Sequence, residues 1–123
     1  MKDKQSHNTN VLMRIEYLLN TQKIHLKSDL SVEELACAAG VHPRKLSSIV
    51  KSHFGCSYAQ LIMKHRVNEA KQLLLEADEL PVTEVALKSG FNSLASFHRS
   101  FKQATGRAPT QYQQTQALVE THY

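Results

Sequence analysis

The chain has 123 residues, of which 41% are hydrophobic and 21% charged, and its formal net charge is +4. This size and composition suit one small domain, or two small lobes sharing a core, and they argue against an unfolded chain. The basic excess favours an acidic partner such as nucleic acid.

Other functional classes are disfavoured by what the sequence lacks. No run of 18 apolar residues is present, so we expect no membrane-spanning helix and no membrane partner. The two cysteines cannot build a disulfide framework, and neither stands at zinc-ligand spacing from another Cys or a His pair. We expect Cys37 to lie on the inner side of a helix, and we expect a cytoplasmic protein with reduced thiols and no metal or cofactor.

The first part of the chain, about residues 10–56, predicts three helices. Residues 1–9 are interpreted as a disordered leader or as the cut edge of a longer protein. An apolar helical period covers Val11 to Thr21, and a connector follows. Ser31-Val32-Glu33-Glu34 is a capping box, which predicts a helix to Ala39 that ends at Gly40. Pro43 begins the next helix, which ends at Gly55. Its expected buried residues are Leu46, Ile49, Val50 and Phe54.

A long linker helix is predicted over about residues 57–77, with Ser57 as its cap. At 1.5 Å per residue it reaches roughly 30 Å. Its expected inward residues are Tyr58, Leu61, Ile62, Ala70, Leu73, Leu74 and Ala77.

The last part, about residues 80–114, predicts three more helices in the same order. Pro81 begins the first, Asn92 can cap the second, and Ala108-Pro109 begins a short one through Tyr112, with a frayed tail over 115–123. The expected inward residues are Val82, Val85 and Ala86 in the first helix, and Leu94 or Phe97, Phe101 and Ala104 in the second. No strand-like alternation is present, so the fold class is all-α with seven helices.

The chain contains an internal repeat. The segment Glu34-Leu35-Ala36-Cys37-Ala38-Ala39-Gly40-Val41 returns fifty residues later as Glu84-Val85-Ala86-Leu87-Lys88-Ser89-Gly90-Phe91. A further apolar-periodic run follows each copy and ends at a second glycine. Such a repeat indicates one helix-turn-helix unit used twice, and this unit presents its second helix to a DNA groove.

Charge segregates within each copy. No acidic residue occurs between Glu34 and Glu69 or between Glu84 and Glu120, whereas basic residues occur in both intervals. The second half of each copy is therefore purely basic, as expected of a face that meets phosphates.

The candidate contact residues lie opposite the buried positions of the second helix of each copy. In the first copy they are Arg44, Ser47, Ser48 and Lys51; in the second they are Ala95, His98, Arg99 and Lys102, flanked by Leu94 and Ser96. Arginine matches the O6 and N7 atoms of guanine, and Leu94 and Ala95 offer only apolar contacts, most usefully to a thymine methyl group. Lys51, Lys102 and Arg107 lie near or beyond the helix ends, where phosphates are the expected partners.

The linker length suggests how two recognition helices would be used. Roughly 30 Å is close to the 34–36 Å between equivalent positions in successive major grooves of B-DNA. We therefore hypothesise that helices over about 43–54 and 93–105 enter successive major grooves of one asymmetric site.

At these residues the chain resembles the AraC/XylS family of bacterial transcription regulators, over about residues 10–114. The most specific part of the resemblance is the spacing of Gly90-Phe91, Phe97, Phe101-Lys102, Gly106, Pro109 and Tyr112. The resemblance implies two helix-turn-helix lobes bridged by a long helix, binding to double-stranded promoter DNA, and activation through RNA polymerase. It also implies base contacts by Arg44, Ser47, Ser48, Leu94, Ala95, Ser96, His98 and Arg99. We expect this DNA-binding domain to be monomeric on its own, either as a stand-alone regulator or as part of a larger effector-responsive one.

The sequence disfavours two other functional classes. A DNA-processing enzyme needs clustered carboxylates or a reactive cysteine, and the acids here stand at helix caps and turns. A helical protein-interaction domain would show no salt-sensitive DNA binding. The sequence therefore predicts a DNA-binding protein that is not an enzyme.

Overall fold

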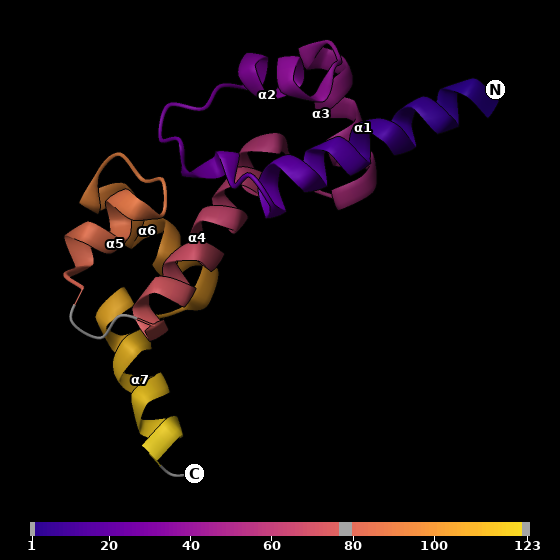
Figure 1. Ribbon diagram of the computed structural model, residues 1–123. Coiled ribbons are helices and arrows are strands. Elements are labelled where there is room, and N and C mark those ends of the chain that lie inside the picture. Colours follow the sequence, from indigo (N-terminus) through magenta and orange to yellow (C-terminus); the bar gives the residue numbers. More distant parts are fainter. Residues whose placement is uncertain (1, 77–79, 122–123) are drawn as a thin grey trace. The chain divides into compact units, whose positions relative to one another are not determined.

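The computed structural model describes residues 2–76 and 80–121, and every regular element among them is helical (Figure 1). The elements in chain order are α1 (Lys2–Asn20), the short 3-10 helix η1 (Ile24–Leu26), α2 (Val32–Ala39), α3 (Pro43–Phe54), α4 (Tyr58–Glu76), α5 (Val82–Lys88), α6 (Leu94–Thr105) and α7 (Pro109–Thr121). The predicted all-α class with seven α-helices is confirmed.

The structure divides into two compact lobes between Ile62 and Met63, inside α4. Each lobe has its own hydrophobic core. The first part of the predicted linker helix contributes to the core of lobe one, and its later part contributes to the core of lobe two.

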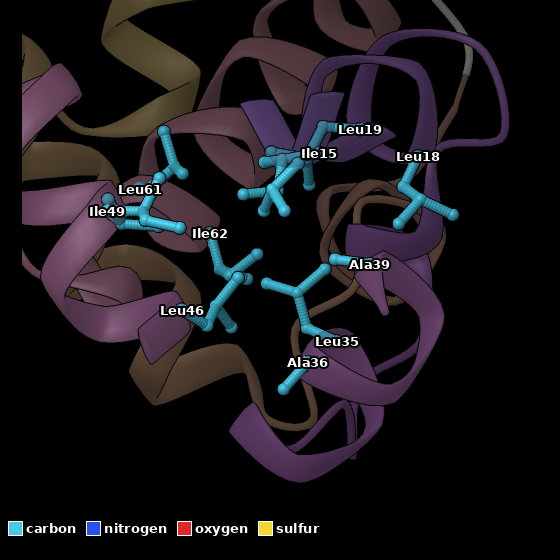
Figure 2. Close-up of a cluster of buried hydrophobic side chains, with 12 residues drawn as sticks. Ile15, Leu18, Leu19, Leu35, Ala36, Ala39, Leu46, Ile49, Leu61 and Ile62 are labelled. Atoms are coloured by element: carbon cyan, nitrogen blue, oxygen red, sulfur yellow. The ribbon is translucent and has the colours of Figure 1, made fainter. Parts of the chain in front are cut away.

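The core of lobe one joins α1, α2, α3 and the first turns of α4. Figure 2 shows the side chains from these helices converging on one another. The buried residues are Val11, Ile15, Leu18, Leu19, Leu35, Ala36, Ala39, Leu46, Ile49, Val50, Leu61 and Ile62. The small Ala36 and Ala39 let the backbone of α2 approach its neighbours closely, which sets the path of the chain into α3.

The core of lobe two is more aromatic. The Phe97 ring centroid lies 5.2 Å from that of Phe91 and 5.6 Å from that of Phe101, and the Tyr112 ring meets Phe101 edge-on at 5.3 Å. Tilted and edge-on pairs of this kind are favourable ring geometries. The other buried residues are Val67, Ala70, Leu74, Val85 and Ala86.

The same turn joins the helices of each helix-turn-helix unit. The backbone N–H of Val41 donates to the Ala36 carbonyl at 3.0 Å, and that of Phe91 donates to Ala86 at 3.0 Å. The glycine before each of these residues has positive φ, 78° at Gly40 and 98° at Gly90. Glycine is needed here because a side chain disfavours this left-handed backbone. The structure thus confirms that the sequence repeat is a repeated turn.

The helix caps agree with the sequence in most places. The Ser31 hydroxyl accepts a hydrogen bond from the Glu34 backbone N–H at 3.1 Å, and the Glu34 carboxylate interacts with the Ser31 backbone, as the capping box predicts, and also with the Lys27 ammonium. Ser57 and Gln60 form a complete box, with bonds of 3.2 and 3.0 Å. The predicted end of this helix at Ala77 lies outside the described residues.

Both terminal helices are longer than expected. Residues 2–9, interpreted as a disordered leader, belong to α1, since no Gly or Pro interrupts them. α7 continues past Tyr112 into the expected tail, to Thr121. Early in α7 the Gln113 Nε2 donates to the Leu74 carbonyl at 3.0 Å, a tertiary contact that helical periodicity does not reveal.

Three assignments of single residues were wrong, those of Cys37, Asn92 and Ala104. Cys37 is exposed, because Leu35, Ala36 and Ala39 define the inner face of α2 and Cys37 points away from it. Ser93 rather than Asn92 caps α6. Phe97 and Phe101 fill the inner face of α6, and Ala104 is exposed; of the alternatives Leu94 and Phe97, Phe97 is the buried one and Leu94 is exposed. Leu94 is the first residue of α6 and Ala104 is the next to last, so both lie beyond the ends of the packed row that Phe97 and Phe101 form.

Candidate nucleic-acid interface

α3 and α6 are structural equivalents at an offset of 51 residues. Leu46 corresponds to Phe97 and Val50 corresponds to Phe101, and all four side chains are completely buried. Equivalent burial fixes the same rotation of the two helices about their axes. The outward positions can therefore be compared one to one.

On α3 the predicted contact residues all face solvent. Arg44, Ser47, Ser48 and Lys51 are exposed, and they recur at the spacing of one helix face. The start of the helix is fixed by His42, whose Nδ1 accepts a hydrogen bond from the Arg44 backbone N–H at 3.4 Å. This face combines one guanidinium, two hydroxyls and one ammonium group, and it carries no acid.

On α6 the corresponding face has a different chemistry. Leu94, Ala95, Arg99 and Lys102 are exposed, whereas Ser96 and His98 are half-buried. The His98 ring lies 5.8 Å from the Phe97 ring and is tilted by 60° to it, so the core limits its freedom. The exposed Ala95 stands where lobe one has Arg44. Ser47 and Ser48 of lobe one are replaced by His98 and Arg99.

The third predicted phosphate contact follows α6. Arg107 is exposed just after Gly106, and its backbone N–H donates to the Thr105 hydroxyl at 3.1 Å. Gly106 has φ of 80°, which ends α6. The loop therefore has a defined backbone, while the guanidinium remains accessible to a ligand.

Two further side chains, Arg14 and Ser89, position the turns, and no local pattern predicts the first of them. The Arg14 Nη1, on α1, donates to the Ala39 carbonyl at the end of α2, 25 residues away in sequence, at 3.3 Å. This bond satisfies a helix-end carbonyl beside the Gly40 turn. In lobe two the buried Ser89 hydroxyl lies at the corresponding helix end. It is within hydrogen-bond distance of two carbonyl oxygens to which it can donate, that of Val85 at 2.6 Å and that of Ala86 at 3.1 Å. Ser89 and Ala39 occupy equivalent positions of the internal repeat. Comparison of the two copies could therefore have singled out Ser89, because it is polar where lobe one has alanine.

An exposed ion pair between Lys27 and Glu34 lies at the start of α2. The hydrogen bond from Lys27 lowers the pKa of the Glu34 carboxyl, and the same bond raises the pKa of the Lys27 ammonium. This pair neutralises an acid in the unit that presents α3. Among the described residues, no group of three or more His, Cys, Asp or Glu side chains is placed to hold a metal ion, and no helix is long and apolar enough to cross a membrane.

The two equivalent units and their outward basic faces define a helix-turn-helix module. Comparison with known proteins identifies its family. The model described as "Helix-turn-helix domain" matches residues 35–115, more than half of the chain. The chain therefore belongs to the AraC-type helix-turn-helix family, whose members are DNA-binding transcription regulators and not enzymes.

Individual relatives agree with this assignment. The chain is 35% identical over 89 residues to the probable transcriptional regulator LumQ of Photobacterium leiognathi, covering 72% of this chain and 36% of LumQ. The C-terminal domain of AraT, a response regulator from Geobacillus stearothermophilus, matches with a TM-score of 0.75 and 36% identity, over 85% of this chain and 84% of that domain. The chain thus spans about a third of the length of LumQ.

A third relative has been solved with a nucleic acid. The DNA-binding domain of AdpA, a global transcriptional factor, in complex with a target DNA, matches with a TM-score of 0.75 and 25% identity. The match covers 86% of this chain and 91% of that domain.

Proposed function

We propose that α3 and α6 enter successive major grooves of one asymmetric promoter site. The observation that carries the proposal is the repeated presentation: two helices follow the same turn, bury equivalent residues and expose basic faces. The AdpA domain, of similar fold, was solved with its target DNA, which supports this use of the fold. The 19 residues of α4 give a helix of about 28 Å, comparable with one turn of B-DNA.

The proposal assigns base contacts to one set of residues and phosphate contacts to another. Base contacts are assigned to Arg44, Ser47, Ser48, Leu94, Ala95, Ser96, His98 and Arg99. Phosphate contacts are assigned to Lys51, Lys102 and Arg107. The division follows their positions, because the first turns of a recognition helix reach base edges and its later turns approach the backbone.

The proposed regulatory consequence is activation of bacterial transcription through contact with RNA polymerase. This part rests on the family to which the chain belongs. In vitro transcription from a promoter carrying the selected site tests it: added protein should raise transcript yield, and a fall in yield would instead identify a repressor.

A selection from random DNA followed by footprinting tests the DNA-binding geometry. We expect an asymmetric site with protection in two successive major grooves, and binding that weakens steeply with salt. A palindromic site, or protection of a single groove segment, would contradict the two-groove arrangement. Binding that does not depend on salt would favour a protein-interaction domain.

Arginine substitutions test the base contacts. Arg44→Ala or Arg99→Ala should cost about 1–3 kcal/mol at the selected site and relax preference at one base pair. Lys88→Ala serves as a control, because this exposed lysine lies at the end of α5, outside both recognition helices, and its loss should leave base preference unchanged. Equal losses on selected and random DNA would reassign the substituted arginine to a phosphate.

A further inference from the structure

The first turn of α6 presents hydrocarbon where the first turn of α3 presents charge. Leu94 is 41% exposed and Ala95 is exposed, whereas their equivalents at the offset of 51 residues are Pro43 and Arg44. Because Phe97 and Phe101 supply the buried face of α6, Leu94 is not required to fill the core. An exposed leucine therefore lies on the part of a recognition helix that meets base edges.

The neighbouring polar groups do not change this character. The Ser93 hydroxyl accepts a hydrogen bond from the Ser96 backbone N–H at 3.1 Å, since Ser93 is the cap of α6. Ser96 itself is half-buried. The exposed side chains of this turn, Leu94 and Ala95, have no hydrogen-bonding group, so they cannot discriminate bases by donors or acceptors.

The major groove offers one apolar group to such a surface. Thymine carries a C5-methyl group there, whereas the edges of adenine, guanine and cytosine present nitrogen and oxygen donors and acceptors. We propose that Leu94 and Ala95 make the lobe-two half of the site specific for thymine through its methyl group. This inference rests on the proposed function, because it requires α6 to lie in a major groove.

The next turn of α6 carries a charged side chain, Arg99, close to the apolar Leu94 and Ala95. Arg99 lies four residues after Ala95, on the same helix face, and its guanidinium is exposed. One helical turn rises 5.4 Å, or about one to two base pairs at 3.4 Å each. The lobe-two half-site should therefore contain a thymine and a guanine at positions within about two base pairs of each other. In lobe one, by contrast, Arg44 places the charged group at the start of the recognition helix.

Deoxyuridine substitution tests the methyl contact directly. Each thymine of the selected site is replaced in turn by deoxyuridine, which removes the methyl group and keeps the O4 acceptor and base pairing. We expect one or two positions in the lobe-two half to lose about fourfold in affinity each, the change that corresponds to one buried methyl-sized group. The remaining thymines should tolerate the replacement.

A double-mutant cycle then assigns the contact to Leu94. Leu94→Ala should weaken binding to the thymine site and should have little further effect on the deoxyuridine site. Leu94→Gln, which keeps the size and adds polarity, should behave in the same way. Leu87→Ala is the matched control, because Leu87 is also exposed, at 60%, but lies on α5; it should leave the deoxyuridine effect intact.

The outcomes separate this inference from the function on which it rests. If the chain binds its selected site with steep salt dependence but no thymine responds to methyl removal, the methyl proposal is overturned and DNA binding stands. Equal effects of Leu94→Ala on thymine and deoxyuridine sites would also overturn it. If the chain binds no DNA, the proposed function fails and this inference fails with it.

Discussion

The turn of lobe one should be unusually sensitive to a methyl group at Gly40. This glycine has φ of 78°, and a Cβ built on it would lie 2.5 Å from the Arg14 Nη1. Gly55, in the same lobe, has φ of 74° and no heavy atom within 4 Å of the corresponding Cβ. Alanine at either position therefore incurs left-handed strain of roughly 1–2 kcal/mol. Only Gly40→Ala also displaces the guanidinium that donates to Ala39.

The extra cost is the hydrogen bond that Arg14 loses. A typical intramolecular hydrogen bond contributes about 0.5–1.5 kcal/mol to stability. We therefore expect Gly40→Ala to lower the free energy of unfolding by about 1 kcal/mol more than Gly55→Ala. In an Arg14→Ala background this difference should disappear, because the bond is already absent and the small side chain leaves room for the Cβ.

Urea denaturation followed by far-ultraviolet circular dichroism measures these costs, since the chain has no tryptophan to report unfolding by fluorescence. Amide hydrogen exchange locates the change to the ends of α2 and α3. Strictly additive effects of Gly40→Ala and Arg14→Ala, or equal costs at Gly40 and Gly55, would refute the view that Arg14 holds this turn.

Three other predictions concern single side chains. Ser89→Ala should cost less than about 1 kcal/mol in denaturation experiments, because buried Ala39 occupies the equivalent position in lobe one and the carbonyls keep backbone donors; a larger loss would give the hydroxyl an essential role. Lys102→Ala should reduce the slope of log affinity against log salt by about one unit on all DNA sequences, and an unchanged slope would remove it from the phosphate contacts. The lowered pKa of Glu34 means that its contribution to stability is present above the ordinary glutamate pKa and is lost as pH falls through the lowered folded-state value. The stability difference from Glu34→Gln should therefore shrink in acid, as it should when Lys27 is replaced by methionine, and a difference independent of pH would contradict the pairing.

Much of the fold follows from local signals in the sequence. Gly40 and Gly90 mark the two turns because positive φ favours glycine, and Pro43 begins α3 because its fixed φ suits a first helical turn. The internal repeat also predicts that the outward positions of α3 and α6 are equivalent. These signals involve residues within about one helical turn of each other, where the backbone itself sets the geometry.

The recognition helices themselves were predicted unevenly. The outward face of α3 follows from periodicity, because Leu46, Ile49 and Val50 leave one clear inner face. On α6 the apolar residues are spread more widely, and the sequence left Leu94 and Phe97 as alternatives for the inner position. The structure places Phe97 inside, where it packs against Phe91 of the preceding turn, and the solvent exposure of Leu94 then gives the face its apolar character.

The sequence by itself therefore determined the helical class, the repeated turn and the residues available to each outward face, because caps, glycines and periodicity act locally. Only the tertiary structure decided which apolar residues are buried, since burial depends on which surfaces meet. It also decided that Arg14 reaches Ala39 and that Gln113 reaches Leu74, because these partners are 25 and 39 residues apart and no local rule joins them.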